Sequence, residues 1–200
     1  MDILKKKEPK QARSKETVDI ILQSVIELVT SDETKELNTT VIAGRAGVSV
    51  GSVYQYFPSK SAIFSALIDR HMNQELEFIR DCLAKFSILP IETAVSDMVD
   101  AIFSKRKKSV VLEHSLLRFF SRFGNLDFII QNDAQLIATV NEALELAAAK
   151  GKITKTPLSG FMMAHSIRSI FFAATLEKRE LYQDGLLAAE LKRLLIGYLK

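Results

Sequence analysis

Two short helical segments joined by a tight turn are the feature that most constrains the fold of this chain. Thr39 can cap the first helix, and Gly47 can adopt the left-handed conformation on which many helices end. Ser49 can cap the second helix, Val50–Tyr56, which Pro58 stops. The segment therefore predicts two short helices that cross close to their connecting turn.

The spacing of residues within these two helices fits a helix-turn-helix. If Thr39 is the first position, the small Ala43 is fifth, where the helices cross, and Gly47 is ninth, in the turn. Val53 is then fifteenth and faces the core of the helix pair. Residues 37–68 also contain no Asp or Glu, so this surface would not repel the phosphates of DNA. We therefore interpret it as a DNA-binding surface.

The second helix carries side chains that suit a DNA groove. Gly51 and Ser52 are small enough for close approach, whereas Tyr54, Gln55 and Tyr56 offer hydrogen-bond donors and acceptors. An ordinary structural interpretation stays open for each of them, because tyrosines in short helices often pack against a core. Their joint presence on an acid-free segment favours DNA binding.

Lys60 lies just after this helix, at the start of the next one, where its ammonium group can neutralise a phosphate. Ser59 can cap that next helix, whose N-terminal amides add to the attraction for an anion. A lone lysine can also be merely solvated, so this interpretation depends on the surrounding motif.

The motif Tyr-x-Tyr-Phe-x-x-Lys, formed by Tyr54, Tyr56, Phe57 and Lys60, completes a known pattern. With the helix-turn-helix spacing, it makes residues 14–68 similar to the DNA-binding domain of the TetR family of one-component transcriptional regulators. The resemblance implies a regulator rather than an enzyme. It also implies a homodimer that binds a palindromic operator in double-stranded DNA, with the third helix in the major groove. A small-molecule effector in each C-terminal domain would alter the separation of the two reading heads.

The resemblance assigns DNA contacts position by position. The residues expected in the groove are Val50, Gly51, Ser52, Tyr54 and Gln55, and those expected on or near phosphates are Thr39, Thr40, Tyr56 and Lys60. Tyr56 stands where many members have His, and Val50 is apolar where a polar or basic residue is frequent. Val50 is therefore expected to contact a thymine methyl group.

The N-terminus and the composition are typical of a cytoplasmic protein. Cys82 is the only cysteine, which excludes an intramolecular disulfide and suits a reducing compartment. The sequence shows no secretory signal, and no apolar run reaches the roughly 18 residues needed to span a membrane. Residues 1–13 are expected to form a flexible basic arm, and apolar residues at helical spacing predict a first helix from its N-cap Ser14 to Thr30.

The rest of the chain has helical periodicity and no strand pattern, so an all-α fold is expected. A long fourth helix, about residues 59–86, would join the N-terminal three-helix head, residues 14–70, to a larger helical domain, residues 71–200. This larger domain would bind the ligand and form the dimer. One helix is expected from Pro90 to the basic cluster Lys105–Lys108, and a separate one from there to Gly124. Three more would cover about residues 126–150, 157–176 and 185–199.

Aromatic and polar side chains of the C-terminal part are candidates for an effector site. Nine of the twelve Phe residues lie between residues 86 and 172, although such residues at helical spacing also form ordinary cores. His and Arg on otherwise apolar stretches would orient an apolar or weakly acidic ligand. The candidate ligand-binding residues are Phe103, His114, Arg118, Phe123, Met162, His165, Arg168 and Phe172.

The last helix carries an apolar stripe that suits a dimer interface, and in the TetR family the last two helices pack against those of a second subunit. The stripe consists of Leu187, Leu191, Leu194, Leu195 and Tyr198. The three histidines lack metal-ligand spacing, so neither a metal nor a cofactor is expected. One alternative function remains, namely a DNA-binding protein of the same fold that has no small-molecule ligand and is controlled by a protein partner.

Overall fold

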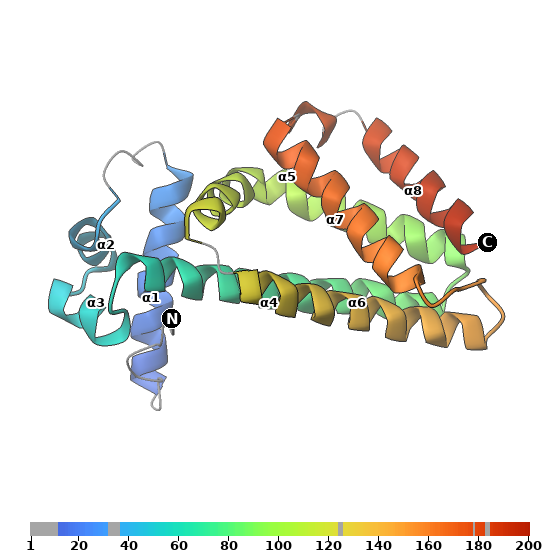
Figure 1. Ribbon diagram of the computed structural model, residues 1–200. Helices are drawn as coiled ribbons and strands as arrows, with labels where there is room; N and C mark the ends of the chain where they lie inside the picture. The colour runs from blue at the N-terminus through green and yellow to red at the C-terminus, as the bar shows by residue number, and fades with distance from the viewer. Residues whose placement is uncertain (1–11, 32–36, 124–125, 178, 183–184) are drawn as a thin grey trace. The chain divides into compact units, whose positions relative to one another are not determined.

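The computed structural model consists of α-helices grouped in two compact units. It describes residues 12–31, 37–123, 126–177, 179–182 and 185–200, and their side chains except those of 12–13, 118–123, 126–129, 177 and 179. Unit 1 comprises residues 1–71 and 115–124, and unit 2 comprises residues 72–114 and 125–200. The described residues form eight α-helices and no strand, which confirms the predicted all-α fold (Figure 1).

Unit 1 contains α1 (Ala12–Thr30), α2 (Thr39–Ala46), α3 (Val50–Tyr56) and the first turns of α4 (Lys60–Ala84). Its core combines side chains from all four helices, because each helix buries one apolar stripe. The fully buried members are Ile21, Val25, Ile42, Val53, Ile63 and Phe64. The prediction that Val53 faces the core of the helix pair is therefore confirmed.

Two predictions about the start of helices were wrong. Helix α1 already includes Ala12 and Arg13, so Ser14 lies inside the helix rather than at its N-cap. Both preceding residues favour helix, and nothing in their sequence stops it. Residues 1–11, the larger part of the predicted basic arm, lie outside the described residues. Thr39 is not the cap of α2 either, because Asn38 takes that position, as described below.

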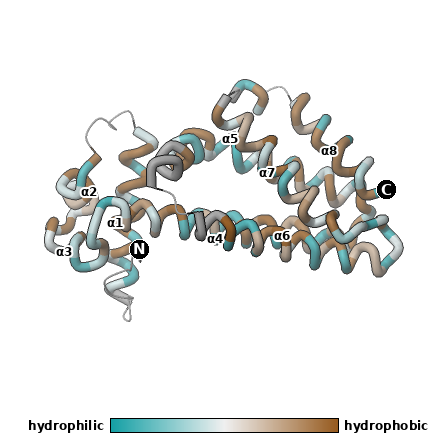
Figure 2. The backbone as a smooth tube through the Cα atoms, viewed as in Figure 1, coloured by the Kyte–Doolittle hydropathy of each residue, from teal (hydrophilic) through white to brown (hydrophobic). Residues whose placement is uncertain are grey.

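Unit 2 contains the rest of α4, the 3-10 turn η2 (Lys85–Ser87), most of α5 (Ile91–Phe123) and α6 (Leu126–Ala149). It ends with α7 (Ser159–Glu177), the short η3 (Arg179–Tyr182) and α8 (Leu186–Leu199). Hydrophobic residues recur along each of these helices between hydrophilic ones (Figure 2), and one face of each enters a common core. Members of this core include Phe86, Val95, Leu144, Met163 and Leu191.

Helix α5 corrects the predicted break near residue 108. It is one continuous helix of 33 residues, and the basic cluster Lys105–Lys108 lies near its middle. No Gly or Pro occurs at the expected boundary, and Lys and Arg favour helix, so nothing stops it there. The cluster therefore does not act as a C-terminal cap, and two of its members instead pair with glutamates of unit 2.

Close helix packing in unit 2 depends on a glycine at the start of α7. A Cβ atom at Gly160 would collide with the side-chain amide of Asn141 on α6. The close approach of α7 to α6 therefore depends on the absence of a side chain at residue 160. Further along α7, the carbonyl oxygen of Phe171 accepts a hydrogen bond from the hydroxyl of the buried Tyr182 (3.0 Å), and burial raises the pKa of this phenol.

Among the described residues, no helix combines the length and the apolar character that crossing a membrane would require.

Candidate DNA-binding surface and other functional residues

Helix α2 begins and ends on capping contacts that fix its position before the turn. The side-chain oxygen of Asn38 accepts a hydrogen bond from the Val41 amide (2.9 Å). At the other end Gly47 has φ +66°, and the Val48 amide donates to the carbonyl oxygen of Ala43 (3.0 Å). This left-handed cap confirms the predicted role of Gly47, because few other residues adopt such a φ without strain.

Helix α3 has the predicted bounds and the predicted cap. Ser49 Oγ accepts a hydrogen bond from the Ser52 amide (3.0 Å) and lies 2.8 Å from Ser52 Oγ. Phe57 then leaves the helix in an extended conformation, as expected of a residue that precedes proline. The hydroxyl of Ser52 is thus shared with the cap, so this side chain holds the helix start as well as lying on the candidate surface.

The exposed side of α3 carries the predicted groove residues. Tyr54 is 45% exposed, and Gln55 and Gly51 are also exposed, whereas Val50 and Tyr56 are half-buried. The Tyr54 hydroxyl lies 3.2 Å from Thr39 Oγ1 at the start of α2. This contact joins the two helices at the surface and restricts the Tyr54 side chain, which lowers the entropy cost of using it in binding.

The start of α4 adds a candidate phosphate site. Ser59 Oγ accepts a hydrogen bond from the Ala62 amide (3.2 Å), which confirms the predicted cap. Lys60 is the first residue of the helix, and its ammonium group lies 5.9 Å from the centre of the Phe64 ring. The ammonium group of Lys60 therefore lies at the N-terminus of α4, and both the cation and the positive end of the helix dipole would attract a phosphate.

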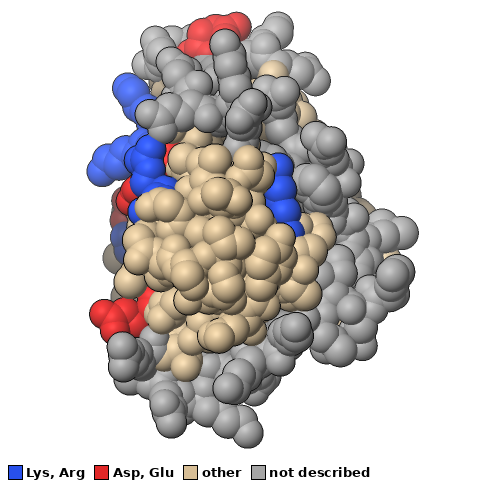
Figure 3. Space-filling view, turned by 90° about the vertical axis from the view of Figure 1, so that its left-hand side faces the viewer, with Lys and Arg blue, Asp and Glu red and all other residues tan. Residues whose placement is uncertain are grey.

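The face of unit 1 that carries α2 and α3 is free of charge at its centre. Figure 3 shows this face with uncharged residues in the middle and Lys or Arg at both margins, where Asp or Glu also lie at the left. Residues 37–68 contain no Asp or Glu, so this segment places no carboxylate on the face. Such a surface lets base edges approach the middle while cations reach the phosphates on either side.

The predicted effector contacts lie in different environments of the chain. Phe103 is buried in the core of unit 2, with its ring 4.9 Å from that of Phe171. Met162 and Phe172 are exposed on α7, and His114 is half-buried. The side chains of Arg118 and Phe123 lie outside the described residues. These residues thus do not share one environment, and the assignment of an effector site to them stays a prediction.

His165 and Arg168 do lie together on α7. Arg168 Nη2 is 2.8 Å from His165 Nδ1, and the guanidinium also pairs with Asp133 of α6. The ring of His165 packs against Phe161 at 4.2 Å between centroids. These two predicted polar residues are therefore neighbours, but Asp133 already neutralises the arginine.

A buried ionic cluster between α4 and α5 was not predicted. Glu75 pairs with Lys105 (2.5 Å) and with Arg106 (3.0 Å), and Arg106 also pairs with Glu113. Both glutamates are buried. The sequence did contain a signal, because Glu75 and Glu113 interrupt apolar helical stripes. It gave no indication of which cations would neutralise them.

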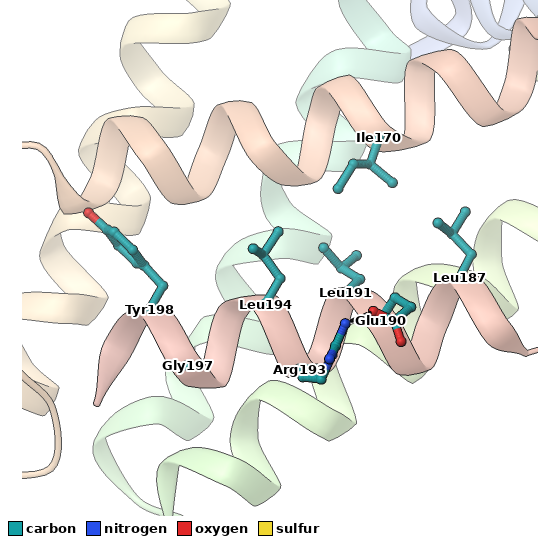
Figure 4. Close-up of a pocket in the computed structure, with 8 residues that line it drawn as sticks. All are labelled: Ile170, Leu187, Glu190, Leu191, Arg193, Leu194, Gly197 and Tyr198. Atoms are coloured by element: carbon teal, nitrogen blue, oxygen red, sulfur yellow. Dashed lines mark hydrogen bonds and ion pairs between the residues drawn. The ribbon is translucent and has the colours of Figure 1, made fainter.

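The predicted dimer residues on α8 divide into two groups. Leu191 and Leu195 are buried in the core of unit 2 and Leu187 is half-buried, whereas Leu194 and Tyr198 are exposed. An open groove of about 620 Å³ lies beside them and is lined by Ile170, Leu187, Glu190, Leu191, Arg193, Leu194, Gly197 and Tyr198 (Figure 4). The outward face of α8 is therefore apolar with one acidic and one basic side chain.

These features define a class of protein. The chain has a capped helix-turn-helix, and the second helix of this motif exposes polar side chains on a face without acidic residues. A larger helical unit follows it. This is the architecture of a helical DNA-binding regulator.

Comparison with known families gives the specific assignment. The family of bacterial regulatory proteins of the tetR type matches residues 34–67, and the tetracyclin repressor-like C-terminal domain matches residues 90–199. The chain therefore belongs to the TetR family. It is a DNA-binding transcriptional regulator and not an enzyme, as predicted from the resemblance.

Relatives by sequence include nucleoid occlusion factors named SlmA. The one from Shewanella amazonensis is 28% identical over 148 residues, which cover 74% of this chain and 66% of that protein. The one from Haemophilus ducreyi is 44% identical over 57 residues, or 28% of each protein. The chain thus matches less than two-thirds of the length of these relatives.

Solved structures share the fold over almost the whole chain. A TetR-family regulator from Mesorhizobium loti has a TM-score of 0.71 at 18% identity and covers 95% of this chain and 100% of its own. FadR from Bacillus subtilis, solved with stearoyl-CoA, has a TM-score of 0.67 at 18% identity, with coverages of 91% and 99%. SmeT bound to triclosan has a TM-score of 0.65 at 20% identity and covers 92% of each chain. SmeT is the repressor of a multidrug efflux pump of Stenotrophomonas maltophilia.

Proposed function

We propose that the chain is a ligand-responsive repressor that binds a palindromic operator as a homodimer and is released by a small molecule. The observation that carries this proposal is the exposed face of α3, where Tyr54 and Gln55 project from a segment without acidic residues. A helix of this kind fits the major groove of DNA, where its side chains can reach base edges.

The DNA contacts follow from the positions of the side chains. Val50, Gly51, Ser52, Tyr54 and Gln55 would face the bases, and Thr39, Thr40, Tyr56 and Lys60 the phosphates. The hydrogen bond between Tyr54 and Thr39 supports these two assignments. It holds Tyr54, proposed to enter the groove, beside Thr39, proposed to contact a phosphate, before DNA binds. Gln55 is exposed and has the geometry to form two hydrogen bonds with adenine.

The effector would bind in unit 2, within the region predicted as the ligand-binding domain, residues 71–200. SmeT and FadR, which share this fold, bind triclosan and stearoyl-CoA, respectively. By analogy, an apolar or weakly acidic molecule would bind between the helices of unit 2, where aromatic residues such as Phe103 and Phe171 are concentrated.

The operator can be sought in the DNA that flanks the protein's own gene, because regulators of this kind often act there. Fragments that bind the full chain in vitro would be enriched, sequenced and footprinted. We expect a protected palindrome and a loss of about 1–3 kcal/mol of binding free energy for Tyr54→Phe or Gln55→Ala. If no fragment is enriched over random DNA, the operator-binding proposal is contradicted.

A second candidate function is DNA binding under the control of a protein partner, without a small-molecule ligand. The relatives named nucleoid occlusion factors favour it, because their name describes an action on the nucleoid rather than a response to a metabolite. Both candidates use the same DNA-binding surface, so the difference between them concerns unit 2 alone.

A thermal-shift screen against a panel of apolar and weakly acidic compounds separates the two candidates. A true effector raises the melting temperature by mass action and should weaken operator binding at the same concentration. A repressor requires at least one compound with both effects. Stabilisation without any loss of operator affinity, or no hit in a broad panel, would favour control by a protein partner.

A further inference from the structure

The outward face of α8 has an unusual composition for a helix surface in a single subunit. Leu186 is 61% exposed and Leu194 is 51% exposed, and Gly197 lies on the same side of the helix. A Cβ atom at Gly197 would meet nothing within 4 Å, so the subunit's own packing does not require a glycine there. Exposed leucines beside a glycine suit the close approach of another helix.

Two opposite charges lie within this apolar face. Glu190 and Arg193 form an ion pair with each other across one helical turn, and their side chains are 53% and 80% exposed (Figure 4). An exposed pair of this kind contributes little to the stability of a single subunit. The two groups can therefore exchange partners at small cost when a second surface covers them.

The face is complementary to itself in one register. If two α8 helices pack antiparallel across a two-fold axis centred between residues 191 and 192, Glu190 of each subunit lies opposite Arg193 of the other. The same register sets the large Leu186 opposite Gly197 and sets Ala189 opposite Leu194. A parallel arrangement would instead oppose Glu190 to Glu190 and Arg193 to Arg193, which like-charge repulsion disfavours.

We propose that the occupant of this face is α8 of a second copy of this chain, held antiparallel by reciprocal Glu190–Arg193 ion pairs that select the same chain as partner. Charge complementarity and size complementarity coincide in this one register. The inference rests on the homodimer proposed above and adds to it how the chain recognises itself and rejects related regulators.

Charge exchange between two full-length chains tests this pairing. In an E190R homodimer two guanidinium groups would face each other, and in an R193E homodimer two carboxylates would do so. We expect the dimer dissociation constant of each variant to rise at least about tenfold. An equimolar mixture of the two variants, carrying different tags, should form a one-to-one heterodimer close in affinity to the wild-type dimer. Sedimentation equilibrium and native mass spectrometry measure both quantities.

The double variant E190R/R193E is the more stringent test. It should form homodimers again, because residues 190 and 193 still carry opposite charges. It should not form heterodimers with the wild-type chain, because like charges would then lie opposite each other at both positions. E142R, the same charge reversal at an exposed position of α6, serves as the control and should leave the dimer unchanged. Circular dichroism melting curves confirm that each variant is folded.

The outcomes separate this inference from the proposed function. A monomeric wild-type chain would overturn the homodimer and this pairing together. A wild-type dimer whose single variants keep their affinity, or a double variant that mixes freely with wild type, would overturn only the pairing. Selective heterodimers and an orthogonal double variant support it.

Discussion

Single side chains in unit 1 have structural as well as predicted DNA-binding roles. Ser52 shares its hydroxyl with the cap of α3, and Tyr54 is hydrogen-bonded to Thr39. Replacement of either residue can therefore change local structure and DNA contact together. Lys60 and Gly51 allow cleaner tests, because the caps of their helices are formed by Ser59 and Ser49 and neither residue is buried.

Lys60→Ala should weaken binding to all DNA sequences and lower the slope of log affinity against log salt concentration by about one unit. The physical reason is the loss of one cation that releases counterions from the phosphates. Binding titrations at several salt concentrations measure the slope. Lys107→Ala, which removes an exposed lysine of α5, is the control. An unchanged slope for Lys60→Ala would contradict the phosphate contact.

Gly51→Ala should leave the fold intact or stabilise it by roughly 0.5–1 kcal/mol, because the new Cβ has only Ser49 Oγ nearby, at 3.7 Å. It should nevertheless reduce operator affinity if the backbone of α3 approaches the bases closely. Gly44→Ala is the matched control, since that glycine is also exposed and helical and has no predicted DNA contact. Equal operator affinity for the two variants would place Gly51 away from the bases.

At the scale of elements, α4 and α5 are joined by buried ions as well as by apolar packing. Glu75 of α4 forms ion pairs with Lys105 and Arg106 of α5. The Nε atom of Arg106 is buried and has no hydrogen-bond partner among the described residues. Buried ion pairs add little net stability, but the removal of one partner leaves the other uncompensated. The cluster therefore fixes how these two helices pair within unit 2.

Glu75→Gln should lower the free energy of unfolding by roughly 2–4 kcal/mol, because Lys105 loses its counter-charge and Arg106 keeps only Glu113 in a partly buried site. Urea denaturation followed by circular dichroism measures the change. Glu77→Gln makes the same substitution at an exposed position two residues away on α4 and should cost almost nothing. A similar unfolding midpoint for both variants would show that the cluster does not hold the helices.

At the scale of the whole molecule, tight binding to a palindrome requires two reading heads in one particle. The exposed apolar residues of α8 are the surface on which the proposed homodimer depends. Leu191 and Leu195 are buried within the subunit, so changes there would test folding instead. Leu194 is the better probe because it is exposed and lies beside the groove.

Leu194→Glu should yield folded monomers whose operator affinity is lower by about a hundredfold or more, because the two half-sites are no longer bound by one linked pair. Analytical ultracentrifugation and operator titration measure the two effects. Ile88→Glu, an equivalent change at an exposed apolar residue outside α8, is the control. A dimer that survives Leu194→Glu would move the interface to another surface.

The sequence by itself determined the features that depend on local rules. The caps Ser49 and Ser59, the left-handed Gly47 and the helical periodicity were predicted because each depends on a few neighbouring residues. Where two local signals competed, the prediction failed, as when Asn38 rather than Thr39 capped α2. The continuity of α5 was open to prediction as well, because no Gly or Pro interrupts it near residue 108. Only the tertiary structure decided the pairing of Glu75 with Lys105 and Arg106 and which leucines of α8 are buried. Both depend on contacts between residues far apart in the chain, and neither charge attraction nor the hydrophobic effect specifies in the sequence which distant partner is chosen.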